Sequence, residues 1–79
     1  RMSNSTIDAC IRANLASYFR DLGDTEPGAL YDMVVKAVER PLLEDVMQRT
    51  GNNQSRAAQW LGLNRNTLRK KLLEHGLLE

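Results

Sequence analysis

An all-α fold is predicted for this chain of 79 residues. Apolar residues recur every three or four positions through its first part, and a glycine between two capping asparagines divides its last part into two short helices. No stretch alternates polar and apolar residues as an exposed strand would. We therefore expect a four-helix subunit, in which an amino-terminal helical hairpin for dimerisation precedes a carboxy-terminal helix-turn-helix.

Three segments follow one another along the chain. Residues 1–5 are expected to be a disordered start or an added remnant, with Met2 as the natural first residue. Residues 6–51 form the predicted helical dimerisation region, with a kink at Pro41. Residues 52–79 form the predicted helix-turn-helix region.

Two helices are expected in the dimerisation region. Ser5–Asp8 has the spacing of a capping box, and the helical pattern that follows ends at Gly23. Pro27 suits the first turn of the second helix, where a missing amide costs no intrahelical bond. The apolar stripe keeps its phase across Pro41, so one bent helix that ends at Gly51 is favoured over two separate helices.

The helix-turn-helix prediction depends on small and capping residues. Asn53 and Asn64 can accept hydrogen bonds from the first-turn amides of the two helices. Gly62 lies between the helices, where a left-handed backbone is least costly for a residue without a Cβ. Ala57 and Ala58 offer a small face that a second helix can cross closely. The apolar contacts for that crossing come from Leu61, Leu63, Leu68 and Leu72.

Charge is divided unevenly along the chain, although the net charge is only +1. Residues 1–48 hold five basic and eight acidic side chains, a net charge of −3, whereas residues 49–79 hold six and two, a net charge of +4. Four cations share the last predicted helix without an acidic i,i+4 partner before Glu74, so local pairing does not neutralise them. A cationic end beside an anionic body indicates that the end meets a polyanion.

The second predicted helix carries more apolar side chains than one packing partner could cover. A second copy of the chain is the simplest cover, because a chain this short buries only a modest core by itself. Packing of the same residues within one monomer is the alternative. The predicted dimer interface comprises Ile11, Leu15, Phe19, Leu30, Val34, Val38 and Leu42.

The remaining chemically distinctive residues are expected to be structural. Cys10, the one cysteine, suits a small buried hydrophobe and excludes an internal disulfide. Trp60 is expected to fill space between helices, His75 to interact with a helix end or solvent, and Glu39 and Glu44 to be solvated. One histidine, one cysteine and no glycine-rich phosphate loop argue against an enzyme, a cofactor or a metal site. No apolar run reaches the length of a membrane span.

The chain resembles the Fis family of bacterial DNA-binding proteins. The resemblance is densest in Arg40-Pro41-Leu42-Leu43, in Asn53-Gln54-Ser55-Arg56-Ala57-Ala58 and in residues 62–72, and it is weaker at Tyr18-Phe19 and Leu30-Tyr31. It implies an all-helical homodimer whose first two helices intertwine. It also implies a DNA-binding and DNA-bending protein of transcription regulation and nucleoid organisation, located in the cytoplasm and nucleoid. Double-stranded DNA is then the main partner, and RNA polymerase is a further candidate.

The resemblance also assigns site residues. It gives base-edge contact to Asn64, Arg65 and Arg69, and phosphate contact to Asn53, Ser55, Thr67, Lys70 and Lys71. The chemistry agrees for Arg65, because an arginine at the start of a recognition helix can place its planar fork on the two acceptors of guanine. The alternative for Arg65 is phosphate contact alone.

Some residues depart from the family pattern. Leu73 and Glu74 follow the paired lysines where the family continues with basic residues, and Gly51 and Asn52 stand where a further basic residue is frequent. The family's amino-terminal arm, which stimulates site-specific invertases, has no counterpart before the first predicted helix, so the resemblance implies DNA bending and leaves recombinase stimulation open.

Two alternatives to a Fis-like function stay open. The chain could be the DNA-binding carboxy-terminal segment of a bacterial enhancer-binding activator, or a helical dimer that binds proteins through Leu73 and Leu77. A start at Met2 and a full first helix favour a free-standing protein over the first alternative. The cationic last helix argues against protein binding as the sole function.

Overall fold

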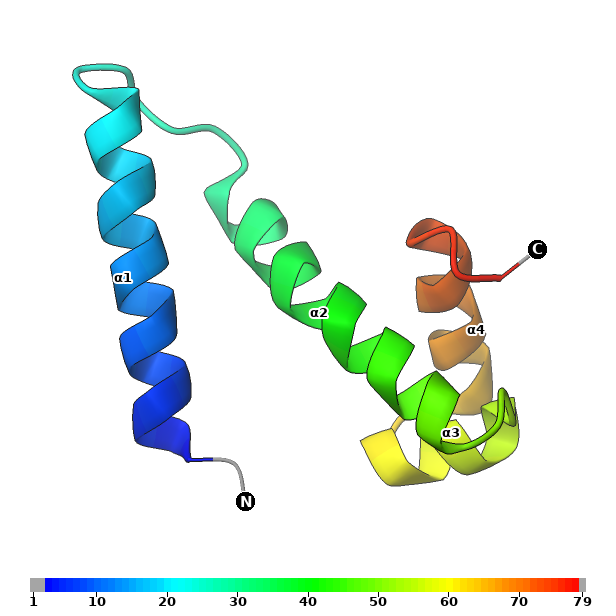
Figure 1. Cartoon of the computed structure of the whole chain (residues 1–79). Coiled ribbons are helices and arrows are strands. Elements are labelled where there is room, and N and C mark those ends of the chain that lie inside the picture. Colours follow the sequence, from blue (N-terminus) through cyan, green and yellow to red (C-terminus); the bar gives the residue numbers. More distant parts are fainter. Residues whose placement is uncertain (1–2, 79) are drawn as a thin grey trace.

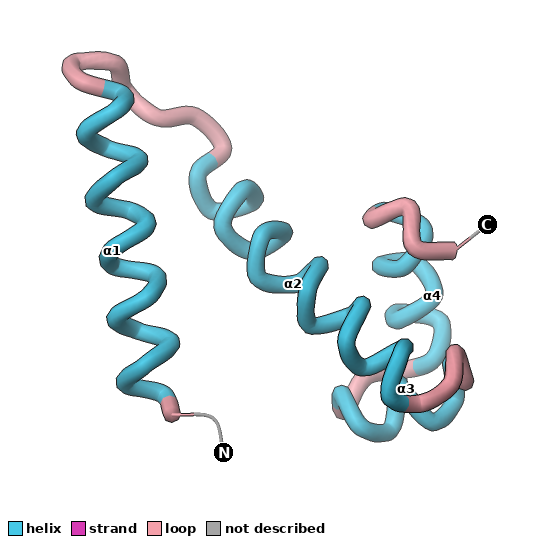
Figure 2. Tube along the Cα trace, in the orientation of Figure 1, coloured by secondary structure: helices cyan, strands magenta, loops and turns pink. Residues whose placement is uncertain are grey.

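The computed structural model describes residues 3–78 and has four helices in that part of the chain (Figure 1). No strand occurs among these residues (Figure 2), so the all-α prediction is confirmed. Arg1 and Met2 lie outside the described residues. The expectation of an added first residue concerns these two positions and stays a prediction. The helices are α1 (Asn4–Leu22), α2 (Leu30–Arg49), α3 (Gln54–Leu61) and α4 (Arg65–Glu74).

The amino-terminal end of α1 differs from the prediction. Asn4 and Ser5 are already helical, so they do not belong to a disordered start. Ser3 occupies the N-cap position without a side-chain hydrogen bond. The expected capping box is wrong because the Asp8 carboxylate accepts a hydrogen bond from Arg12, one turn further on, instead of from the helix start.

The connection between α1 and α2 is longer than expected. Pro27 lies in the loop, and α2 begins only at Leu30. Ala29 precedes the helix with φ 51° and ψ 35°, a left-handed conformation that interrupts the helical path from Pro27. Pro41 lies inside α2, which confirms one continuous helix, whereas the kink at that residue stays a prediction.

The buried core lies at the carboxy-terminal end of the chain. Leu43 and Met47 of α2 pack on buried residues of α3 and α4, namely Ala57, Ala58, Leu68 and Leu72. Thr50 is buried at the end of α2, and its hydroxyl donates to the carbonyl of Val46 at 2.9 Å. The last turns of α2 and the helix-turn-helix therefore form one packed unit.

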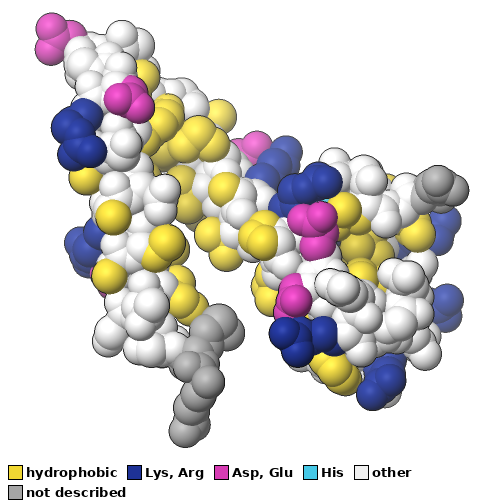
Figure 3. Space-filling view, in the orientation of Figure 1, with side chains coloured by type: hydrophobic (Ala, Val, Ile, Leu, Met, Phe, Trp, Pro, Cys, Tyr) yellow, Lys and Arg dark blue, Asp and Glu magenta, His cyan; other side chains and the backbone are white. Residues whose placement is uncertain are grey.

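The helical hairpin of α1 and α2 has little core of its own. Figure 1 shows the two helices diverging from their connecting loop, and no residue of α1 is buried. The radius of gyration is 15.1 Å, whereas a compact chain of this length has a value of about 12 Å. Apolar side chains gather on the facing sides of α1 and α2 (Figure 3). Among residues 3–78, no helix has the length and apolarity needed to cross a membrane.

Candidate nucleic-acid interface

The helix-turn-helix of α3 and α4 has the capping that the sequence predicted. The side-chain oxygen of Asn53 accepts from the amide of Arg56 at 3.0 Å, and that of Asn64 accepts from the amide of Asn66 at 2.8 Å. Gly62 ends α3 in the left-handed region at φ 71° and ψ 28°. These contacts satisfy amides that would otherwise have no intrahelical partner, so they fix where both helices begin.

The small face of α3 allows α4 to approach closely. Ala57 and Ala58 are buried, and Leu68 and Leu72 of α4 are fully inaccessible to solvent. Leu68 and Leu72 are four residues apart and therefore share one face of α4. With that face committed to the core, the opposite face of α4 is left on the surface.

The exposed side of α4 is basic. Arg65 and Arg69 lie four residues apart near the first turns of the helix, and Lys70 follows; all three are exposed. Asn64 and Thr67, assigned by resemblance to base and phosphate contact, are exposed as well. The predicted contacts at the start of α3, Asn53 and Ser55, are also accessible. We call Arg65, Arg69 and Lys70 the basic face of α4.

Lys71 lies in a different environment from the other cations of α4. Its Nζ is 2.8 Å from Oε2 of Glu39, and the two side chains are 32% and 17% exposed. The hydrogen bonds from Lys71 and His75 hold the pKa of the Glu39 carboxyl below its usual value, and the hydrogen bond to Glu39 raises the pKa of Lys71. The expectation that Glu39 is solvated is therefore wrong. The absence of an acidic i,i+4 partner on α4 does not extend to contacts between helices, because Lys71 pairs with Glu39 of α2.

His75 is also a structural partner of α2. Its Nε2 is 2.8 Å from Oε1 of Glu39, and its side chain is almost completely buried. Nη1 of Arg40 donates to the carbonyl of His75, which caps α4. The expected placement at a helix end is confirmed, whereas contact with solvent is not. Glu44 pairs with Arg40 on the surface of α2 and is exposed, as expected.

Two side chains that were expected to be buried are exposed. Trp60 is 51% exposed, and the guanidinium of Arg56 lies 5.4 Å from the centroid of its ring. Cys10 is exposed and lines the space between α1 and α2. Both predictions were based on the position of each residue on its own helix, which does not show whether another element covers it.

The fold and the surface of α4 place the chain in the helix-turn-helix class. A family model described as bacterial regulatory protein, Fis family, matches residues 34–75, the part that contains most of α2 and the whole helix-turn-helix. A protein of Ralstonia nicotianae named putative Fis-like DNA-binding protein is 60% identical over 98% of this chain and 100% of its own length. This chain belongs to the Fis family.

Two further relatives have similar names. A putative Fis-like DNA-binding protein of Neisseria meningitidis is 62% identical, with 91% of each chain covered. A protein of Vibrio atlanticus named DNA-binding protein Fis is 46% identical over 85% of this chain and 68% of its own length. The alignment to the Ralstonia protein covers nearly the whole chain and therefore includes α1 and α2 as well as the motif.

Proposed function

We propose that this chain is a homodimeric DNA-binding and DNA-bending protein that acts in transcription regulation and nucleoid organisation. The observation that carries the proposal is the basic face of α4, which is exposed on the second helix of a capped helix-turn-helix while Leu68 and Leu72 of the same helix are buried. A helix held in this way can enter the major groove with its first turn toward the base edges. The names of its relatives and membership of the Fis family support the same conclusion.

Different roles are proposed for the exposed polar residues. Arg65 and Arg69 extend from the early turns of α4 and have the fork geometry that matches guanine, with Asn64 beside them. Lys70 and Thr67, together with Asn53 and Ser55 at the start of α3, are proposed to hold phosphates, since helix starts present free amides to anions. The base contacts select the sequence, and the phosphate contacts set the register of the helix on the duplex.

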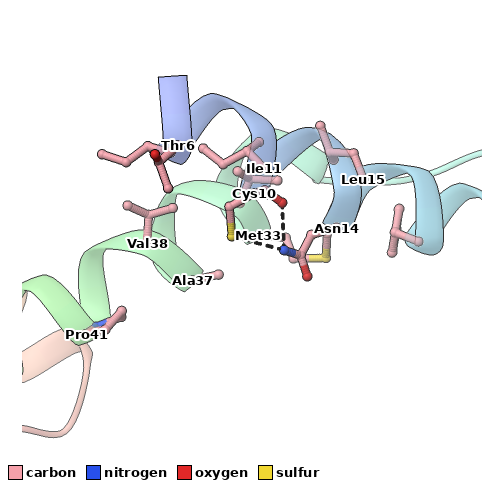
Figure 4. A pocket seen from close by; sticks show the side chains of 12 residues that line it. Thr6, Cys10, Ile11, Asn14, Leu15, Met33, Ala37, Val38 and Pro41 are labelled. Carbon is pink, nitrogen blue, oxygen red and sulfur yellow. Dashed lines mark hydrogen bonds between the residues drawn. The ribbon is translucent and has the colours of Figure 1, made fainter. Parts of the chain in front are cut away.

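A second copy of the chain is the proposed cover for the hairpin. A groove of about 750 Å³ lies between α1 and α2 (Figure 4). None of the seven predicted interface residues is buried in the single chain. Apolar surface of this extent is unfavourable in water, and a symmetric dimer would bury the same face of both copies. The groove is lined in part by Ile11, Leu15, Met33, Val34 and Val38.

DNA bending follows from the proposed dimer if its two α4 helices are closer than successive major grooves. Those grooves are about 34 Å apart on one face of straight B-DNA. A shorter spacing in the protein requires the duplex to curve toward it. We place the protein in the cytoplasm and on the nucleoid, expect no enzymatic activity, and regard RNA polymerase as a candidate partner in transcription.

The binding experiment compares Arg65→Ala with Lys70→Ala. The probes are a palindromic duplex selected from a random pool by the wild-type protein and a shuffled duplex of the same composition. Arg65→Ala should cost roughly 1–3 kcal/mol for each good base contact and reduce the preference for the selected duplex. Lys70→Ala should weaken both duplexes equally and reduce the salt slope by about one unit.

Two results would contradict this account. If the wild-type protein enriches no sequence from the random pool and does not bind the pool at low salt, the chain is not a DNA-binding protein. If Arg65→Ala lowers both affinities by the same factor as Lys70→Ala, Arg65 contacts phosphate and does not read bases.

Bending is tested by changing only the centre of the selected duplex. A deformable A·T-rich centre and a G·C-rich centre are compared, with the two flanking half-sites unchanged. Curving a site of this length costs on the order of 1–6 kcal/mol, so the deformable centre should bind more tightly. Equal affinity for the two centres, together with normal mobility in a circular-permutation gel, would show that the DNA stays straight.

A further inference from the structure

Glu39 occupies a position on α2 that the core pattern would assign to an apolar residue. Glu39, Leu43 and Met47 are spaced four residues apart and share one face of the helix. Leu43 and Met47 form the α2 side of the buried core. Glu39 therefore extends that packed stripe by one turn, with a carboxylate in place of a hydrocarbon side chain.

The Glu39 carboxylate contacts α4 at two successive turns. Oε2 is 2.8 Å from Nζ of Lys71, and Oε1 is 2.8 Å from Nε2 of His75. Lys71 and His75 are four residues apart, which corresponds to about 6 Å along the helix axis. Nη1 of Arg40 adds a hydrogen bond of 2.5 Å to the His75 carbonyl. We call Glu39, Arg40, Lys71 and His75 the α2–α4 cluster.

Lys71 and Arg69 lie on different sides of α4. Successive residues of an α-helix are rotated by about 100°, so the side chains of Arg69 and Lys71 leave the helix about 160° apart. Lys71 faces α2, and its charge is compensated by Glu39 at an ion-pair distance. An ammonium group that is held in this way would have to leave its carboxylate partner to reach a phosphate.

We propose that Glu39 and Lys71 are positioning residues, which fix the orientation of α4 on α2, and that Lys71 is not a phosphate ligand. The proposal rests on the proposed DNA-binding function, because the orientation matters only where α4 must fit a groove. α2 also carries much of the proposed dimer surface. The cluster therefore connects that surface to the helix that would read the DNA.

The contribution of the cluster differs from that of the core. Leu68 and Leu72 hold one face of α4 against α2 and α3, but apolar contacts are not directional. Charge-assisted hydrogen bonds have preferred distances and angles, so the cluster restrains rotation of α4 about its own axis. Arg65 is about one turn before Leu68. A rotation of α4 about its axis would carry the guanidinium fork of Arg65 away from the base edge.

The experiment compares Lys71→Met with Lys70→Met on the selected and shuffled duplexes over a range of salt concentrations. Glu39→Gln is compared with Asp45→Asn, which removes one negative charge from the same helix but at an exposed pair with Arg49. The double variant of Glu39 and Lys71 completes a thermodynamic cycle. Circular dichroism and a melting curve verify that each variant is folded at the assay temperature.

Lys70→Met should lower the salt slope by about one unit and weaken both duplexes alike. Lys71→Met should leave the salt slope unchanged on the shuffled duplex while reducing discrimination between the duplexes, about three- to tenfold, which is at the low end of the range expected for coupled pairs. Glu39→Gln should cause the same loss of discrimination, and Asp45→Asn should not. The double variant should lose no more than either single variant.

Each contrary result has a distinct meaning. If Lys71→Met lowers the salt slope as Lys70→Met does, Lys71 is a phosphate ligand, and the positioning role is wrong while DNA binding stands. If the wild-type protein enriches no duplex from the random pool and does not bind the pool, the proposed function itself is wrong. If Lys71→Met is unfolded, the comparison of Glu39→Gln with Asp45→Asn decides, and equal discrimination by those two variants overturns the proposal.

Discussion

Val38 provides the sharpest test of the proposed dimer. It lines the α1–α2 groove, and 47% of its surface is exposed in the single chain. Val38→Ala removes two methyl groups, which would contribute about 1.6 kcal/mol if fully buried by the partner. About half of that surface is left for the partner to cover, so each subunit should lose about 0.8 kcal/mol. Both subunits carry the change, and the dimer dissociation constant should rise about tenfold.

Leu73→Ala is the matched control for that variant. Leu73 is 48% exposed, almost the same fraction as Val38, but it lies on α4, outside the proposed interface. Sedimentation equilibrium over a range of protein concentrations gives the dissociation constants of both variants and of the wild-type protein. The dimer reasoning is refuted if the wild-type protein is a folded monomer throughout that range, or if both variants dissociate equally.

Three further predictions concern stability. Leu68→Ala should cost about 2–5 kcal/mol in urea unfolding, because a fully buried leucine of a six-residue core leaves a cavity; a cost similar to that of Leu73→Ala would be inconsistent with this core. Gly62→Ala should cost about 1–2 kcal/mol, because alanine is strained in the left-handed backbone conformation of Gly62. Gly28 has no positive φ and has open space where a Cβ would lie, so Gly28→Ala should be nearly neutral. Equal melting temperatures of the two variants would exclude backbone strain at Gly62. The pKa of Glu39 is lowered from 4.5 by its hydrogen bonds to Lys71 and His75. The Glu39 carboxylate therefore adds to the free energy of unfolding above pH 4.5, and this contribution is lost as the pH falls through the folded-state pKa. The free energy of unfolding of Glu39→Gln should depend less on pH between those two values than that of the wild-type protein, and an unchanged pH profile would contradict this prediction.

The helix-turn-helix was predictable from sequence because its determinants are local. Asn53, Gly62 and Asn64 each act within a few residues of their own position, and the structure confirms both caps and the left-handed glycine. The alanine pair was equally readable, since only small side chains permit a close helix crossing. In such a motif the backbone preferences and the packing requirements point to the same arrangement.

The start of α2 was mispredicted because two local signals compete. Pro27 suits a first helical turn, but Gly28 and Ala29 follow it, and Ala29 adopts a left-handed conformation. A helix cannot include such a residue, so it begins after Ala29. Alanine is a strong helix former, and its sequence position gave no sign of that conformation.

The α2–α4 cluster was missed for a different reason. Glu39 is 32 residues from Lys71 and 36 from His75 in sequence, and their contact depends on how α2 crosses α4. One signal was present: Glu39 is four residues before Leu43, on the face that packs against the motif. An acidic residue on an apolar stripe requires a cation or donor opposite it, because burial of an unpaired charge is costly.

The arrangement of core and cluster has a consequence for DNA bending in the proposed dimer. The helix-turn-helix is attached to α2 by six buried side chains and, one turn earlier, by the contacts of Glu39 and Arg40. Each subunit therefore presents α4 at a fixed angle to α2, and the α2 helices of the two copies would meet in the interface. A recognition helix on a flexible tether could adjust to straight DNA by moving. One that is fixed at several points cannot, so if the two α4 helices are closer than successive major grooves, the duplex has to supply the deformation, and the affinity then depends on how easily its central base pairs bend.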